Sequence, residues 1–362
     1  MNDEVVNKDI VNEDTMNDDV FPGGDWETAE PDSSVDVARV DASLDALFGV
    51  RDQPPGTSLA TVVVHRGRIV RERYGHQPDT AFGPGGPVDR DTTLISWSMA
   101  KSITHAVVGT LVDEGRLELD TPVNVPEWRG SPRATITLRD LLRMRDGLAF
   151  VEDYVLDESG NVVSDVIAML FGAGADDVAA YARSRPSAQA PGSSWSYSSG
   201  TTNIVCSLIG DVVGGREAVE ALLHDRLFAP LGMGSASPRF DSAGTFIGSS
   251  YVYATARDFA RFGYLYLHGG VWAGRRVLSE SWVDTTRDMH AVDPENGHGY
   301  SWHWWCWNAD PRTIAALGYE GQRTIVDRDR ELVVVHLGKW VAETQPILDG
   351  HLSSIIAAFP RR

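Results

Sequence analysis

Residues 98–115 read SMAKSITHAVVGTLVDEG, and this stretch predicts the most regular helix of the chain. Its apolar residues Ile103, Val107 and Leu111 recur every four positions, which is the spacing of one buried helix face. Gly115 follows the last of them, and glycine is a common helix terminator. A polar loop precedes the stretch, so we expect the helix to begin close to its first serine.

Ser98 and Lys101 lie three positions apart at the start of this helix and therefore share one face. A lysine placed there can take the proton of the serine hydroxyl if its surroundings lower its pKa from about 10.4 toward neutrality. The 362-residue chain has only three lysines, Lys8, Lys101 and Lys339, against 29 arginines, which cannot release a proton. On spacing alone, a serine near a helix N-terminus followed by a solvated lysine is an equal alternative.

Charge is distributed unevenly along the chain. The net charge is −19, and −11 of it falls in residues 1–36, which hold twelve acidic residues and one lysine. The absence of a basic run argues against nucleic acid or an anionic membrane surface as a partner. No apolar run approaches the ~18 residues of a membrane-spanning helix, and the acidic start does not resemble a secretory signal.

The two cysteines, Cys206 and Cys306, lie in apolar or aromatic surroundings without metal-ligand spacing. We expect buried free thiols, with a disulfide between them as the alternative. Free thiols agree with a cytoplasmic location.

Strand patterns occupy both ends of the chain and helical patterns the middle, which predicts an α+β protein. Its antiparallel sheet would be flanked by helices and packed against an α-helical subdomain. Residues 1–36 are expected to form an acidic flexible or loosely draped arm, and residues 37–362 one domain, with its sheet part at about 37–95 and 250–362 and its helical part at about 96–249. The expected strands are 59–65, 69–74, 300–307, 322–327 and 331–337, and the expected helices are 41–48, 98–115, 136–146, 203–213, 215–227, 255–268, 280–287 and 346–358.

A second candidate motif is Trp195-Ser-Tyr-Ser-Ser-Gly200, which precedes a predicted helix. A tyrosine in a turn that leads into a helix can reach the Ser–Lys pair, and its phenol both donates and accepts a proton. Taken alone, the motif favours a Tyr197 side chain that merely covers the core over this catalytic role.

Three motifs occur in a fixed order: Ser98-Met-Ala-Lys101, Tyr197-Ser-Ser199 and Gly318-Tyr-Glu-Gly321. The chain thereby resembles the serine β-lactamase and penicillin-binding-protein superfamily, which carries SxxK, then YxN or SxN, then KTG. The segments LVDEGRLELDTPV, ITLRDLLRMRDGL and YATARDFARFGYLYLHGG are similar to its class C and esterase-like branch. Within that branch the chain most resembles the 6-aminohexanoate-dimer hydrolases, which open nylon-oligomer amides and cleave short esters. The resemblance covers about residues 45–350.

This resemblance implies a role for each matched residue. Ser98 would be the acylating nucleophile, Lys101 its general base, and Tyr197 the relay of protons to the leaving group. The backbone N–H groups of Ser98 and Gln322 would form the oxyanion hole.

On the substrate side, the resemblance places Tyr154 at the scissile amide nitrogen and Asp165 near a terminal amine. A solvated aspartate on a polar helix is the alternative for Asp165. Ser249 stands where the nylon hydrolases have an asparagine near the substrate, which weakens the amide assignment and leaves the esterase assignment intact.

The third motif departs most from the superfamily. Tyr319, Glu320 and Gly321 are expected beside the substrate, where many relatives have Lys-Thr or a histidine. A lysine there binds the carboxylate of penicillins, whereas Glu320 would repel it. The second motif also ends in Ser199 rather than asparagine.

Four tryptophans occur within six positions, at Trp302, Trp304, Trp305 and Trp307. In a strand, the first two would face one side and the last two the other. Either all four belong to the core, or one pair, such as that of Trp304, also lines an apolar cleft.

Together these features predict a serine hydrolase that forms an acyl-enzyme on small carboxylic esters and on linear amides such as 6-aminohexanoate oligomers. A D-amino-acid peptidase or weak β-lactamase is the alternative enzyme, and a catalytically silent binding or sensor protein is the non-enzyme alternative. No metal motif, Gly-rich dinucleotide loop or Walker loop is present, so no cofactor is expected. The expected partner is a small-molecule substrate, and a homodimer is left open.

Overall fold

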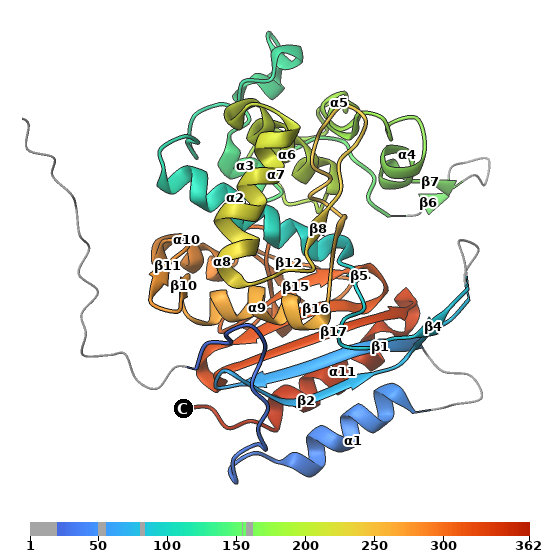
Figure 1. The fold of residues 1–362 in the computed structure, drawn as a ribbon. Helices are drawn as coiled ribbons and strands as arrows, with labels where there is room; N and C mark the ends of the chain where they lie inside the picture. The colour runs from blue at the N-terminus through green and yellow to red at the C-terminus, as the bar shows by residue number, and fades with distance from the viewer. Residues whose placement is uncertain (1–19, 50–55, 80–83, 154, 157–161) are drawn as a thin grey trace, which may run out of the picture.

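The computed structural model describes residues 20–49, 56–79, 84–153, 155–156 and 162–362. At its centre lies an eight-stranded antiparallel sheet with helices on both faces (Figure 1). In spatial order its strands are β12 (Ala291–Val292), β13 (Gly299–Tyr300), β14 (Trp305–Cys306), β15 (Thr313–Gly318), β16 (Gln322–Asp327), β17 (Leu332–Trp340), β1 (Gly56–His65) and β2 (Arg68–Tyr74).

The sheet joins the two ends of the chain. Strand β17 pairs with β1 from Trp340 opposite Gly56 to Leu332 opposite His65. The expected strands 59–65 and 69–74 are β1 and β2, which pair as a hairpin, and the expected strands 322–327 and 331–337 pair in the same way as β16 and β17. The predicted α+β fold with one antiparallel sheet is confirmed.

Strand β1 is buried on both sides, so it is almost continuously apolar rather than alternating. Val62 and Val64 belong to the core shared with the helical part, whereas Val63 belongs to the core under the opposite face. Helices α1 (Val37–Phe48) and α11 (Gln345–Ala357) cover that opposite face, and α9 (Ala256–Leu267) covers the first.

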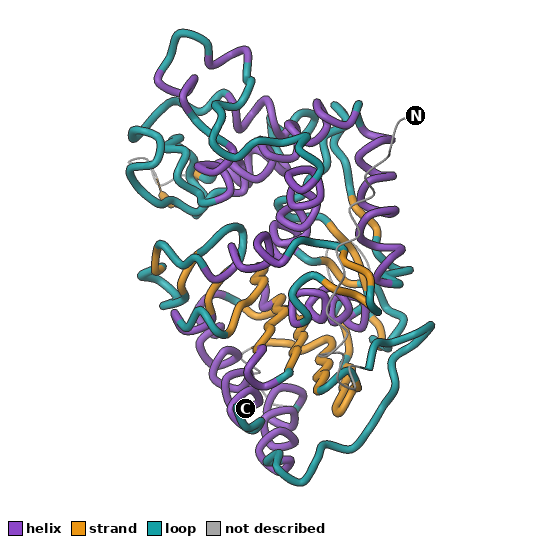
Figure 2. Tube along the Cα trace, turned by 90° about the vertical axis from the view of Figure 1, so that its left-hand side faces the viewer, coloured by secondary structure: helices purple, strands orange, loops and turns teal. Residues whose placement is uncertain are grey.

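The helical part stacks on the α9 side of the sheet, as the two views in Figures 1 and 2 show. Its central helix is α2 (Ala100–Asp113), in which every residue from Ala100 to Leu111 is buried. The helix predicted over residues 98–115 with one buried face is therefore buried on all of its faces. The other helices of this part are α3 (Leu138–Leu142), α4 (Asp165–Phe171), α5 (Val178–Arg183), α6 (Ser199–Val213), α7 (Arg216–Leu223) and α8 (Ala229–Leu231).

Small elements complete the chain. A three-stranded sheet connects the two parts, and short hairpins and one further helix lie around them. Their bounds are β5 (Leu94–Ile95), β9 (Val252–Ala254), β8 (Ser237–Pro238), β3 (His76–Gln77), β4 (Gly86–Pro87), β6 (Val155–Leu156), β7 (Val162–Val163), β10 (Val271–Trp272), β11 (Arg275–Arg276) and α10 (Glu280–Asp284).

The expectation of a flexible arm over residues 1–36 needs correction for its second half. Trp26 is buried and its indole N–H donates to the carbonyl of Arg257 at 3.1 Å. The Arg257 guanidinium binds the Asp25 carboxylate at 2.7 Å, and Thr28 forms a β-bridge with Ile69. Residues 20–36 thus dock on the domain, while residues 1–19 lie outside the described part of the chain.

The predicted strand 300–307 is wrong as a single element. Strand β13 ends at Tyr300 and β14 begins at Trp305, because the chain turns between them with φ of +55° at His303. Both cysteines are buried free thiols, as predicted. In the described part of the chain, no helix combines the length and apolar character needed to cross a membrane.

Candidate active site

A strained turn presents Ser98 at the junction of the two parts. Strand β5 leads into Trp97, whose φ of +43° is unusual for a non-glycine residue. A short 3-10 turn, Trp97–Met99, then runs directly into α2. The Trp97 indole N–H donates to the Glu320 carboxylate at 3.1 Å, which helps to hold the turn. Strain of this kind is typical of functional sites, and it places Ser98 at the positive end of a buried helix.

The Lys101 ammonium lies within this junction and has three oxygen partners. Its Nζ lies 3.0 Å from Ser98 Oγ, 2.9 Å from Ser199 Oγ and 3.1 Å from the carbonyl oxygen of Ser249. A solvated lysine, the alternative reading of the motif, is excluded because only 1% of Lys101 is exposed.

Burial lowers the pKa of Lys101 to about 8, while the negative charge of Glu152 opposes this shift. A substantial fraction of this amine is therefore neutral near physiological pH. A neutral amine 3.0 Å from a hydroxyl can accept its proton.

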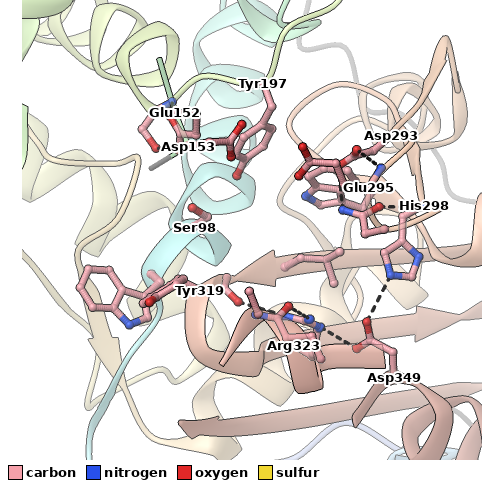
Figure 3. Close-up of a pocket in the computed structure, with 18 of the residues that line it drawn as sticks. Ser98, Glu152, Asp153, Tyr197, Asp293, Glu295, His298, Tyr319, Arg323 and Asp349 are labelled. Atoms are coloured by element: carbon pink, nitrogen blue, oxygen red, sulfur yellow. Dashed lines mark hydrogen bonds and ion pairs between the residues drawn. The ribbon is translucent and has the colours of Figure 1, made fainter. Parts of the chain in front are cut away.

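Tyr197 points toward Ser98, as Figure 3 shows. The Lys101 Nζ lies 4.7 Å from the centre of its ring, which packs against Tyr300 and Trp305. Burial raises the pKa of Tyr197 far above its usual range, and its contact with Ser98 opposes the shift only in part. Tyr197 therefore keeps its proton at neutral pH and can pass it on as an acid.

The oxyanion assignment to Gln322 needs correction. The Gln322 backbone N–H donates to the Tyr319 carbonyl, and its side chain binds Gly338, so it is directed into the sheet. Gly318, at the end of β15, instead packs on the nucleophile: a Cβ there would lie 3.1 Å from Ser98 N. The residue that follows it and lines the cavity is Tyr319.

A cavity of about 810 Å³ opens from Ser98 between the two parts (Figure 3). One wall is apolar and comes from α4, and another carries carboxylates of Asp153, Asp293 and Glu295. The apolar wall consists of Val166, Ile167, Leu170 and Phe171. Repulsion from Asp153, followed by burial and Asp293, raises the pKa of Glu295, so these acids lie close enough to interact.

Among the described residues that line the cavity, Arg323 is the one that supplies a guanidinium, and this group is already occupied. It binds Asp349 at 3.1 Å, Gln345 at 2.7 Å and the carbonyl oxygens of Gly318 and Gln322. Arg323 therefore has little capacity left for a substrate carboxylate. Among the described residues, no group of three or more His, Cys, Asp or Glu side chains could hold a metal ion.

Asp165 does not reach the cavity, which corrects its assignment to a substrate amine. Its carboxylate accepts hydrogen bonds from Arg185 at 2.9 Å, Tyr181 at 2.6 Å and the backbone of Val151 at 2.8 Å. This carboxylate closes a loop and is neutralised within the protein. Tyr154 lies outside the described residues.

Of the other predicted substrate-binding residues, some line the cavity and others are engaged within the protein. Tyr319 lines the cavity, whereas Glu320 binds Trp97 and Lys339, and Gly321 packs against Leu348. The Ser249 side chain is fully buried and pairs with Ser250, so only its carbonyl oxygen reaches the site, through Lys101.

The tryptophan cluster contributes to both the core and the cavity, but the residue that reaches the cavity is Trp305 rather than Trp304. Trp304 is fully buried against Phe262 and Tyr266 and therefore belongs to the core. Trp305 lines the cavity beside Tyr197. Trp304 and Trp305 belong to different core clusters, as the alternation predicts, and the cavity lies on the side of Trp305.

Glu152 and Ser199 are two further functional candidates, to which the sequence motifs assign no role. Glu152 accepts hydrogen bonds from the backbone N–H of Ser199 at 2.7 Å and from its Oγ at 2.6 Å. Ser199 in turn contacts Lys101. The sequence offers one indication of such a partner, because the second motif ends in Ser199 where relatives have the longer asparagine. A second polar side chain can occupy the space that the shorter serine leaves.

Comparison with known proteins agrees with this geometry. A model of the beta-lactamase family matches residues 48–346, most of the chain. The chain belongs to the beta-lactamase family. It is 29% identical over 321 residues to 6-aminohexanoate-dimer hydrolase of Paenarthrobacter ureafaciens, covering 84% of this chain and 78% of that protein.

The chain is also similar to an esterase and to a solved structure. The chain is 30% identical over 217 residues to esterase EstB of Burkholderia gladioli, covering 55% of this chain and 52% of that protein. A penicillin-binding-protein homologue from Caulobacter crescentus has the same fold, with a TM-score of 0.66 at 17% identity over 92% of this chain and 99% of that one. The protein is thus a serine hydrolase of the beta-lactamase family.

Proposed function

We propose that this hydrolase forms an acyl-enzyme on Ser98 and acts first on small carboxylic esters, with linear amides as further substrates. The observation that carries the proposal is the 3.0 Å contact between Ser98 Oγ and the buried amine of Lys101 at the wall of the cavity. A purely binding or sensing role would not require a buried lysine, which is costly to keep in a core.

In the proposed reaction, Lys101 takes the proton of Ser98 as its Oγ attacks the ester carbonyl carbon. The carbonyl oxygen becomes an anion, which the backbone N–H groups of Ser98 and Tyr319 would stabilise. Collapse of this intermediate expels the alcohol, and Tyr197 donates the proton that it needs and recovers one from Lys101. Water then attacks the acyl-enzyme, with the same groups acting in reverse.

The charge of the cavity supports neutral or cationic substrates over penicillins. Asp153, Asp293 and Glu295 line it, and Arg323 is bound to Asp349. A β-lactam or a D-alanyl peptide carries a carboxylate that would face these acids, so the alternative of a weak β-lactamase or D-amino-acid peptidase is less well supported.

Linear amides are less well supported as substrates than esters. Relatives include 6-aminohexanoate-dimer hydrolase, but the Asp165 carboxylate expected to bind a terminal amine is occupied by Arg185. Ester hydrolysis needs no such contact. A cytoplasmic location and a homodimer stay predictions.

A hydrolysis panel tests the proposal. It compares p-nitrophenyl acetate, 6-aminohexanoate dimer, nitrocefin and a D-alanyl peptide, each with the native protein and with Ser98→Ala. We expect turnover of the ester that Ser98→Ala abolishes, and little turnover of nitrocefin. Turnover of nitrocefin or the D-alanyl peptide above that of every ester would favour the alternative.

A further inference from the structure

A carboxylate stands one residue behind the Ser98–Lys101 pair. Both oxygens of Glu152 accept hydrogen bonds from Ser199, one from the backbone N–H at 2.7 Å and one from Oγ at 2.6 Å. The same Ser199 Oγ lies 2.9 Å from Lys101 Nζ. The described side chains therefore form a continuous line, Ser98–Lys101–Ser199–Glu152.

The direction of each bond follows from the number of protons available. A serine hydroxyl has one hydrogen, and a carboxylate has none, so the Ser199 hydrogen points to Glu152. Only lone pairs of Ser199 are then left to face Lys101. Together with Ser98 Oγ and the Ser249 carbonyl oxygen, they offer three acceptors, which match the three hydrogens of an ammonium.

We propose that Glu152 is a positioning residue of this active site: it holds the Ser199 hydroxyl as an acceptor and supplies the counter-charge for the ammonium form of Lys101. The proposal rests on the function proposed above for Ser98 and Lys101. Glu152 touches neither the reacting atoms nor the proton in transit. It acts through Ser199, as the third member of a hydrolase triad acts through its base.

The other groups around Lys101 are neutral when the enzyme works. Burial raises the pKa of Tyr197 far above its usual range and that of Cys206 to about 12. Burial also lowers the pKa of His303 to about 3, and its Nδ1 lies 2.8 Å from the Leu142 carbonyl oxygen. Burial raises the pKa of the Glu152 carboxyl, while the charge of Lys101 and the two hydrogen bonds from Ser199 favour its ionised form. In the described part of the site, Glu152 is the carboxylate that can balance a charge on Lys101.

The proton balance gives Glu152 two opposite effects. Lys101 gains one proton from Ser98 on attack and returns one, through Tyr197, to the leaving oxygen. A nearby negative charge stabilises the ammonium formed in between and so favours attack. The same charge raises the pKa of the free amine, so that a higher pH is needed to make it a base.

Glu152→Gln separates these effects while keeping the shape of the side chain. We expect the acid limb of kcat/KM for p-nitrophenyl acetate to move to lower pH by about one unit, because a single charge near the amine has been removed. At high pH, where Lys101 is neutral in both proteins, we expect the rate to fall several-fold. A role in folding alone would lower the rate at every pH without moving the limb.

Asp146→Asn is a matched control. Asp146 is also a buried carboxylate that accepts hydrogen bonds from a hydroxyl of α6, Thr201, and from a backbone N–H, that of Leu148. It does not line the cavity. We expect its substitution to leave the acid limb in place. An acid limb of Glu152→Gln that coincides with that of Asp146→Asn, or that moves to higher pH, would overturn the proposal.

Ser199→Ala provides a second variant in case Glu152→Gln does not fold, which circular dichroism would show. It removes one acceptor of the ammonium, so kcat should fall and the acid limb should again move to lower pH. A native profile in Ser199→Ala would overturn the proposal. Absence of ester turnover by the native protein would instead contradict the function proposed for Ser98, so the two failures are distinguishable.

Discussion

Arg185 neutralises Asp165: its Nη1 lies 2.9 Å from the Asp165 carboxylate, which also accepts hydrogen bonds from the Tyr181 hydroxyl and the Val151 backbone N–H. A carboxylate with these partners supports a loop beside the cavity and is not available to a substrate amine. A structural role and a substrate-binding role of Asp165 therefore predict different effects of its substitution.

Asp165→Ala should therefore reduce stability rather than amine recognition. We expect a loss of about 1–3 kcal/mol in the free energy of unfolding in urea, because buried donors lose their acceptor. Hydrolysis of 6-aminohexanoate dimer and of its N-acetylated form should fall by the same factor. A selective loss for the dimer that carries the free amine, at unchanged stability, would return Asp165 to the binding site.

Gly318→Ala should damage acyl transfer. A Cβ at this position would lie 2.4 Å from the Ser96 carbonyl oxygen and 3.1 Å from Ser98 N, so the end of β15 must move away from the nucleophile. Loss of one oxyanion donor costs a rate factor of about 100–1,000. The measurement is kcat for ester hydrolysis.

Gly210→Ala serves as the control for this change. Gly210 lies in α6, and a Cβ there would have no atom within 4 Å. The substitution should leave kcat unchanged and raise stability by about 0.5–1 kcal/mol, since alanine favours a helix. Full activity in Gly318→Ala would contradict the assignment of the oxyanion hole to this strand end.

Ester hydrolysis should rise with pH through the pKa of Lys101. This amine acts as a base only when neutral, and burial lowers its pKa to about 8. We therefore expect kcat/KM to increase up to about pH 9 and then to level off. Tyr197 produces no falling limb there, because burial raises its pKa far above that range. A plateau already reached by pH 6 would assign the base to another group.

The apolar wall should set the preference for acyl length. Phe171 is 61% exposed at the cavity and can bury against a substrate chain. Phe171→Ala should lower kcat/KM for p-nitrophenyl octanoate about tenfold and leave that for the acetate unchanged, since each buried methylene contributes about 0.8 kcal/mol. Val292→Ala removes another exposed apolar side chain, 52% exposed and outside the cavity lining, and should change neither rate. Equal losses for both esters would contradict this role of α4.

Residues that depend on local geometry could be predicted from the sequence. Ser98 lies in the 3-10 turn that runs directly into the helix of Lys101, so a spacing of three still places both side chains on one face, 3.0 Å apart. The strands β1 and β17 are equally evident, because their apolar runs admit few other structures.

Residues that depend on the path of a loop could not be predicted. The sequence predicts Gln322 in the oxyanion hole, but positive φ at Glu320 and Gly321 turns the chain and directs Gln322 back into the sheet. Asp165 finds its partner, Arg185, twenty residues later in the chain. The role of Glu152 also depends on a long-range contact, with Ser199 forty-seven residues away. None of these pairs has a spacing that local periodicity could indicate.

The account is tested most directly by identifying the acylated residue. After reaction with a fluorophosphonate ester, peptide mapping by mass spectrometry should find the label on Ser98. It should be absent from Ser98→Ala and fully retained in Ser250→Ala, which removes another serine hydroxyl of the same cavity. Stoichiometric labelling of Ser98→Ala would contradict the central claim that Ser98 is the nucleophile.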